Sequence, residues 1–139
     1  EKNGVKINIL GNINTLPKKI KKCLIRSINI TKNCKKIRVN LAINYGSKHE
    51  ILNTFKILKK SQTKVTEKNF EKKLYTKGIP DPDLLIRTGG KRRLSNFLLW
   101  QLSYSELYFI DKLWPDFTVG DYNKILEHFR KVKRNFGKI

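Results

Sequence analysis

The chain has 139 residues, a formal net charge of +20 and a hydrophobic fraction of 39%. This length and apolar content fit a globular protein with a core and exclude an intrinsically disordered chain. Its two cysteines, Cys23 and Cys34, exclude a disulfide framework or a zinc site by number and spacing, and no apolar run is long enough to span a bilayer.

The first half of the chain predicts two strands, each followed by a helix. Alternating or β-branched apolar residues are typical of strands, and apolar residues three or four positions apart are typical of helices. The predicted elements are a strand over residues 5–10, a helix over 17–30, a strand over 36–45 and a helix over 47–60. The second helix is amphipathic, and its apolar residues are Ile51, Leu52, Phe55 and Leu58.

The second half continues the alternation. Thr66 is expected to cap a short helix whose Phe70 and Leu74 face inward. The later elements are a buried strand over residues 83–86, a helix that follows Ser95, a strand over 105–110, loops marked by Pro115 and Gly120, and a last helix over 121–136. Strands that alternate with helices indicate one α/β domain over residues 1–139, with a mainly parallel sheet flanked by helices.

Three of the seven arginines fall in the stretch LIRTGGKRRLSN, residues 85–96. A strand would deliver Arg87 to the carboxyl edge of the sheet, where ligands of α/β proteins gather. Two glycines let the backbone turn, Arg93 follows, and Ser95 would open a helix whose free N–H groups attract anions. Planar guanidinium groups bind phosphate oxygens bidentately, so the stretch predicts a phosphate or diphosphate site. The alternative is that the arginines form structural ion pairs and Ser95 is only a cap.

Glu106 is a lone carboxylate in the otherwise apolar run LSYSELYF. Such a group must be paired, solvated or bound to a cation. Mg²⁺ is often held by one or two carboxylates together with substrate phosphates, which makes Glu106 a candidate metal ligand beside a diphosphate site. A salt bridge to a lysine or to Arg93 is the competing interpretation.

The run DPDLLIRTGGKRRLSNFLLWQLSYSELYF resembles the signature region of the cis-prenyltransferases, in particular the undecaprenyl diphosphate synthases. The segments VKINILG, NYGSKHEI and LWPDF resemble further parts of the same family. The resemblance implies a homodimeric, Mg²⁺-dependent α/β enzyme that condenses isopentenyl diphosphate with an allylic diphosphate such as farnesyl diphosphate. The implied product is a polyprenyl diphosphate such as undecaprenyl diphosphate, which serves as a lipid carrier in cell wall synthesis. The resemblance also implies a cytoplasmic protein with peripheral membrane contact.

The resemblance carries over to individual residues. It implies that isopentenyl diphosphate is bound by Arg87, Arg93, Leu94 and Ser95, and that Glu106 binds the metal. Three positions differ from the family pattern: Lys91 replaces an acidic residue, His49 replaces a tryptophan, and Asn135 replaces an arginine in the ending Arg134 to Gly137.

The family's Asp-Gly-Asn-Gly-Arg-Trp segment has no counterpart here, and the chain contains no methionine. The resemblance places the catalytic aspartate and the allylic diphosphate loop in that segment. We therefore expect the chain to be the C-terminal part of a synthase, to contain no catalytic aspartate, and to be inactive alone.

Two other functions fit part of the sequence. A net charge of +20 is compatible with a nucleic-acid-binding domain, but the lysines are dispersed and the aromatic residues sit mainly in apolar runs, so no nucleic-acid partner is expected. A catalytically inactive partner subunit is the other alternative, and the presence of all the expected binding residues argues against it.

Overall fold

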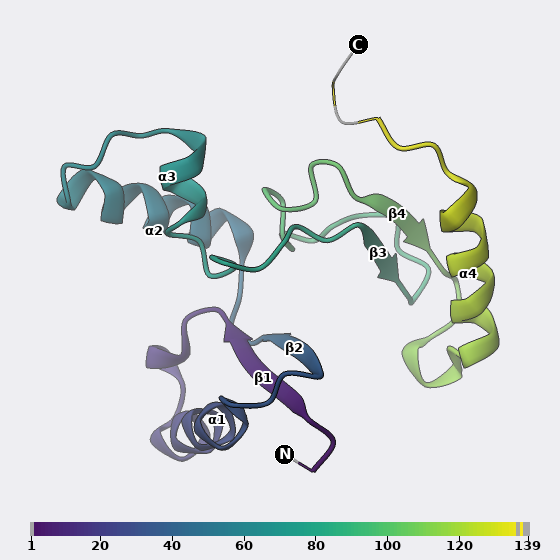
Figure 1. The fold of residues 1–139 in the computed structure, drawn as a ribbon, viewed down its shortest axis with the longest axis horizontal. Coiled ribbons are helices and arrows are strands. Elements are labelled where there is room, and N and C mark those ends of the chain that lie inside the picture. Colours follow the sequence, from purple (N-terminus) through teal and green to yellow (C-terminus); the bar gives the residue numbers. More distant parts are fainter. Residues whose placement is uncertain (1, 136, 138–139) are drawn as a thin grey trace. The chain divides into compact units, whose positions relative to one another are not determined.

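The structure is a computed structural model that describes residues 2–135 and 137. The chain divides into two compact units, residues 1–79 and 80–139 (Figure 1). Each unit contains one two-stranded parallel sheet. The α/β class with parallel strands and flanking helices is confirmed, whereas the single domain expected from the sequence stays a prediction.

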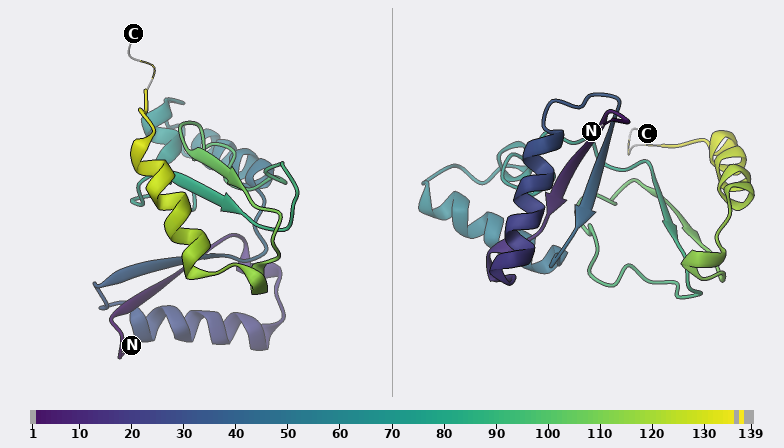
Figure 2. Two further views of the ribbon diagram at one scale, coloured as in Figure 1. Left: turned by 90° about the vertical axis from the view of Figure 1, so that its right-hand side faces the viewer. Right: turned by 90° about the horizontal axis from the view of Figure 1, so that it is seen from below.

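The first unit begins with a β–α–β arrangement. Its elements are β1 (Val5–Leu10), the 3₁₀ turn η1 (Ile13–Thr15), α1 (Lys18–Thr31) and β2 (Ile37–Ala42). The two strands pair in parallel over their whole length, from Val5 opposite Ile37 to Leu10 opposite Ala42. Helix α1 runs beside the strands and packs against β1 (Figure 2). The Thr31 hydroxyl at its C-terminal end accepts a hydrogen bond of 3.0 Å from the Ile7 N–H.

The carboxyl ends of β1 and β2 approach each other closely at Gly11. This residue has φ +124°, and a Cβ atom there would lie 2.2 Å from the carbonyl oxygen of Ile43. Only glycine fits such a backbone approach. Strand β2 ends at Ala42, three residues before the predicted end, because Asn44 turns the chain with φ +49°.

Helix α2 (Ser47–Lys60) has the predicted bounds but not the predicted buried face. Of the four apolar residues expected on that face, Leu58 is buried, whereas Leu52 and Phe55 are exposed. The buried residues are Ser47, Glu50, Thr54 and Leu58. The prediction was wrong because the short α3 (Glu67–Glu71) and the chain after it pack on this more polar side and bond to it. Thr66 caps α3 through the Asn69 N–H, and Phe70 and Leu74 are buried, as expected.

The second unit contains β3 (Leu84–Arg87), β4 (Glu106–Phe109), η2 (Trp114–Asp116) and α4 (Val119–Lys131). The strands pair in parallel, with Leu84 opposite Glu106 and Arg87 opposite Phe109. Helix α4 starts earlier than predicted because Thr118 and Asp121 form a capping box, which places Gly120 in the first helical turn rather than in a loop. The helix ends at Lys131, where Val132 becomes extended, and the predicted end, Phe136, lies outside the described residues.

The helix predicted after Ser95 is absent. Residues 95–104 form a run of turns and bends, and Ser95, Asn96 and Leu98 have positive φ. A right-handed helix requires negative φ, so Ser95 has no helix to cap. Among the described helices, none has both the length and the apolar character needed to cross a membrane.

Candidate functional site

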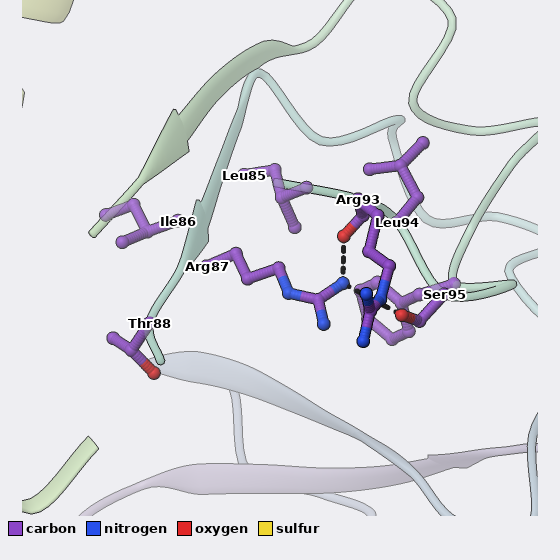
Figure 3. Close-up of a pocket in the computed structure, with 8 residues that line it drawn as sticks. Leu85, Ile86, Arg87, Thr88, Arg93, Leu94 and Ser95 are labelled. Carbon is purple, nitrogen blue, oxygen red and sulfur yellow. Dashed lines mark hydrogen bonds between the residues drawn. The ribbon is translucent and has the colours of Figure 1, made fainter. Parts of the chain in front are cut away.

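A pocket of about 360 Å³ lies at the carboxyl end of β3 and along the loop that follows it. It is formed entirely within the second unit. The lining residues are Leu85, Ile86, Arg87, Thr88, Arg93, Leu94, Ser95 and Phe97 (Figure 3). The structure therefore brings together all four residues predicted to bind the diphosphate. Sequence reasoning missed Thr88 and Phe97, because neither residue type by itself indicates an anion site.

Arg87 holds the loop in its folded path. Its Nη1 donates hydrogen bonds to the carbonyl oxygen of Arg93 and to the hydroxyl oxygen of Ser95, the second at 3.0 Å. Figure 3 shows the side chains of Arg87 and Arg93 extending toward the same space beside Ser95. One of the two predicted anion-binding arginines is thus also a support for the other residues of the pocket.

The two glycines of the loop are fixed by the strand beside them. The Gly89 N–H donates to the Lys112 carbonyl at 2.8 Å, and the Gly90 N–H donates to the Ile110 carbonyl at 3.0 Å. Both glycines have positive φ, +89° and +71°, which other residues adopt only with strain. These bonds continue the β3–β4 pairing past the strand ends and set the direction in which the loop leaves the sheet.

The electrostatic character of the pocket suits an anion. Two guanidinium groups and one hydroxyl group are directed into it, and no acidic residue lies between Asp83 and Glu106 in the sequence. Lys91 and Arg92 are exposed and do not line it, so they add only to the surrounding positive potential. The anion attraction therefore comes from side chains, and not from the helix N-terminus that the sequence had predicted.

Glu106 does not line this pocket. It opens β4 opposite Leu84, at the other end of the strand pair from Arg87, and its N–H donates to the Asp83 carbonyl at 3.0 Å. Within the described residues no group of three metal-ligating side chains comes together. Among these residues Glu106 is therefore not part of a three-ligand cluster, and a metal bound by Glu106 would need further ligands from elsewhere.

A second, polar cavity of about 300 Å³ lies beyond the carboxyl ends of β1 and β2. Its lining residues are Asn12, Thr15, Asn44, Tyr45, Gly46 and His49. The Asn44 side chain ties its two sides together, because Nδ2 donates to the Asn12 carbonyl at 2.7 Å and to the Thr15 hydroxyl at 2.8 Å. His49, one of the three departures from the family pattern, is part of this lining.

Glu50 is 1% exposed and bonds to Tyr45, one of the residues that line this cavity. Its carboxylate accepts hydrogen bonds from the Tyr45 hydroxyl and from the Tyr75 N–H, each at 2.6 Å. Burial, and secondly the charge of Glu50, raise the pKa of Tyr75. Sequence reasoning missed Glu50, although the only acidic residue of α2 could have indicated a buried partner.

Arg134, three residues after the end of α4, bonds to other parts of the second unit. Its guanidinium group forms an ion pair with Asp83 at 2.5 Å, donates to the Tyr104 carbonyl at 3.1 Å and lies 5.6 Å from the centre of the Phe129 ring. The predicted ending of the chain includes Phe136, which lies outside the described residues.

Lys112 connects the glycine turn to α4. Its carbonyl accepts the Gly89 bond, while its ammonium group donates to both carboxylate oxygens of Asp121 at 2.8 and 2.9 Å. This ammonium group, together with the Thr118 N–H and hydroxyl, holds the pKa of Asp121 well below its usual range. The ion pair with Asp121 therefore restrains Lys112, whose carbonyl oxygen accepts the hydrogen bond from the Gly89 N–H.

Replacing Lys112 by methionine is expected to increase amide hydrogen exchange of Gly89 about threefold. This is the size expected for an exposed ion pair that restrains a loop. NMR exchange measurements would show it. Lys124→Met, which removes an exposed charge from α4, is the control and should leave the hydrogen exchange of Gly89 unchanged. An equal increase in Gly89 hydrogen exchange in both variants would show that the Lys112–Asp121 ion pair does not restrain the glycine turn.

A family model described as "Putative undecaprenyl diphosphate synthase" matches residues 1–137. The isoprenyl transferase of Rickettsia prowazekii is 44% identical over 137 residues, which cover 98% of this chain and 61% of the relative. The isoprenyl transferase of Fusobacterium nucleatum is 44% identical over 139 residues, which cover 99% and 60%. The chain thus spans about 60% of the length of the curated relatives it matches.

Two solved structures share the fold. A probable undecaprenyl diphosphate synthase from Campylobacter jejuni superposes with a TM-score of 0.90 at 37% identity, covering 99% of this chain and 65% of that one. Lavandulyl diphosphate synthase from Lavandula x intermedia, solved in complex with dimethylallyl diphosphate, gives a TM-score of 0.91 at 31% identity, with coverages of 99% and 62%. By its match over residues 1–137, the chain belongs to the undecaprenyl diphosphate synthase family of isoprenyl transferases.

Proposed function

We propose that the chain is the C-terminal part of a cis-prenyltransferase. The whole enzyme condenses isopentenyl diphosphate with an allylic diphosphate, farnesyl diphosphate, and the product is a polyprenyl diphosphate, undecaprenyl diphosphate. One observation carries the proposal: Arg87, Arg93 and Ser95 meet in a single pocket directly after a parallel strand. Family membership supports the reaction class.

In this proposal the pocket binds the diphosphate of isopentenyl diphosphate. Arg93 and the Ser95 hydroxyl contact its oxygens, and Arg87 both holds the loop and adds a second guanidinium charge. Leu94 lies between them in the lining, where it excludes water from one side of the group. Fixed positive charge at this point holds the substrate in one orientation and lowers the electrostatic cost of bringing a second diphosphate near it.

We further propose that Glu106 is this chain's ligand to Mg²⁺. Its side chain is half-buried, and among the described residues it has no hydrogen bond or ion pair. When bound, Mg²⁺ would neutralise diphosphate oxygens. The remaining ligands would come from substrate phosphates and from parts of the enzyme outside this chain.

The proposal also covers the catalytic aspartate, the allylic diphosphate site and the partner subunit, none of which is part of residues 1–139. The catalytic aspartate and the allylic diphosphate site belong to the N-terminal part of the whole enzyme, so the chain alone is inactive. The complex of the lavender relative with dimethylallyl diphosphate supports an allylic diphosphate as the second substrate. The enzyme acts as a homodimer in the cytoplasm, in peripheral contact with the membrane.

The test is incorporation of labelled isopentenyl diphosphate into farnesyl diphosphate, with the complete coding region expressed. In Arg93→Ala the kcat/KM for isopentenyl diphosphate should fall about 30-fold or more. In Glu106→Gln the Mg²⁺ concentration for half-maximal activity should rise about tenfold, a size typical of a weakened metal shell. A complete, folded protein without activity would contradict the proposed function. Activity that falls in Glu106→Gln with unchanged Mg²⁺ dependence would contradict only the metal role.

A further inference from the structure

The diphosphate pocket is only half polar. Four of its eight lining residues have hydrocarbon side chains, namely Leu85, Ile86, Leu94 and Phe97. Apolar side chains cannot replace the water that solvates a bare diphosphate, so the binding of charge does not account for them. Small-molecule sites combine a few polar groups that fix the orientation of the ligand with an apolar lining that contacts its hydrocarbon part. The lining therefore indicates a ligand that carries a hydrocarbon group directly beside its anionic group.

The size of the pocket limits that hydrocarbon group. The volume of about 360 Å³ lies near the lower end of the range of about 300–1,000 Å³ that is typical of small-molecule sites. The diphosphate itself occupies the part beside Arg87, Arg93 and Ser95, so only the remainder is left for carbon atoms. The pocket thus fits a short hydrocarbon group and not a long chain.

One tight turn joins the polar and the apolar parts of the pocket. The Phe97 N–H donates to the Leu94 carbonyl at 3.1 Å, and the two residues between them, Ser95 and Asn96, have φ of +50° and +63°. Positive φ at both central positions characterises the type I′ turn. Leu98 has φ +45°, which is uncommon for a large side chain. Backbone held in such conformations clusters at ligand sites, where it keeps side chains in one place.

The turn also couples the position of Phe97 to the anion-binding residues. Phe97 is half-buried and lines the pocket together with Leu94, its partner in the turn. Ser95, at the tip of the turn, accepts the hydrogen bond of 3.0 Å from Arg87. A shift of the backbone at Phe97 that made room for a larger ligand would therefore also move Ser95.

We propose that Phe97 determines the size of the hydrocarbon group that the pocket accepts. The ring packs against the isopentenyl group while Arg93 and Ser95 hold the diphosphate. A substrate with one additional carbon atom would have to displace the ring or the turn, and it would react more slowly. The inference rests on the proposed function, because it takes the pocket to hold isopentenyl diphosphate, and it makes Phe97 a specificity-determining residue of that site.

The test compares isopentenyl diphosphate with the homologue in which an ethyl group replaces the methyl group on the double bond. The complete protein is assayed with Mg²⁺ and farnesyl diphosphate, and kcat/KM is measured for each substrate. The unaltered protein should prefer isopentenyl diphosphate by about 10-fold to 200-fold, the range for one methylene group in an apolar pocket. In Phe97→Leu, which replaces the ring by a smaller side chain, this preference should fall about tenfold.

Phe117→Leu is the matched control. Phe117 is also a half-buried phenylalanine of the second unit, but it stacks on Trp114 and does not line the pocket. This variant should keep the preference of the unaltered protein within about twofold, because only pocket contacts change the ratio of the two kcat/KM values. An equal loss of preference in both variants would overturn the proposal, since general loosening of the unit would then explain it.

Inhibition by inorganic diphosphate separates a contact with the hydrocarbon group from support of the turn. This ion has no hydrocarbon group, so its inhibition constant should change less than about twofold in Phe97→Leu. A rise as large as the rise in KM for isopentenyl diphosphate would show that Phe97 only supports the anion-binding residues, and would overturn the proposal.

The remaining outcomes distinguish this inference from the proposed function. Incorporation of isopentenyl diphosphate with an unchanged preference in Phe97→Leu would overturn the role of Phe97 alone. Absence of incorporation by the unaltered complete protein would overturn the proposed function and this inference with it.

Discussion

Replacing Arg93 by alanine is expected to weaken the binding of isopentenyl diphosphate about 30-fold. This corresponds to the loss of one or two charge-assisted hydrogen bonds to a phosphate group. The loop itself should keep its path, because Arg87 holds the backbone carbonyl of residue 93, which the substitution leaves in place. Isothermal titration calorimetry on the complete protein in the presence of Mg²⁺ would measure the change.

Arg92 supplies the matched control for this result. It is the immediate neighbour of Arg93 and is exposed, but it does not line the pocket. Arg92→Ala removes the same charge at almost the same place and should change the dissociation constant less than threefold, because its charge is screened by solvent. If the two variants lost affinity equally, general positive potential rather than a specific contact would account for binding.

Replacing Glu50 by alanine is expected to lower the free energy of unfolding by about 3 kcal/mol. The substitution leaves the Tyr45 hydroxyl and the Tyr75 N–H without this acceptor in a partly buried place, and each unsatisfied group costs about 1–3 kcal/mol when buried. Urea denaturation would measure the loss. The pKa of Tyr75 should also fall toward its usual value, since one of the two causes that raise it has been removed.

The control for Glu50 is Glu71, an exposed acid in α3. Glu71→Ala should change stability by less than about 0.5 kcal/mol, as is usual for a surface substitution. Glu50→Gln keeps an acceptor for the Tyr75 N–H. Its free energy of unfolding is expected to lie between those of Glu50→Ala and Glu71→Ala. A Glu50→Ala protein as stable as Glu71→Ala would show that the buried carboxylate contributes nothing to the packing of α2 against the chain near Tyr75.

The sequence predicted those features that depend on neighbouring residues. Strand β1 and helix α2 have the predicted bounds because their apolar periodicity and their terminal glycines are local signals. The grouping of Arg87 with Arg93 and Ser95 was predictable for a similar reason. All three lie within nine positions of each other, directly after a strand, so a single turn is enough to bring them together.

The features that were wrong or missed depend on residues far apart in the chain. The buried side of α2 is set by the chain near Tyr75, 25 residues beyond Glu50, and no periodicity within α2 contains that information. Ser95 resembles a helix cap in sequence, but its backbone has φ +50°, and its hydroxyl accepts from Arg87 instead of from the next turn. In both cases a tertiary hydrogen bond replaced the local pattern.

The restriction of each strand pair to its own unit has a consequence for the order of folding. Strands β1 and β2 are joined through α1, and β3 and β4 through the pocket loop, so neither pairing requires residues from the other unit. Val5 pairs with Ile37 and Leu84 with Glu106, separations of 32 and 22 residues, so each pairing closes a loop that lies wholly within its own half of the chain. During synthesis the β1–β2 ladder can therefore close before the second half has left the ribosome. The diphosphate pocket, whose residues all lie between Leu85 and Phe97, can then form as a later, separate event.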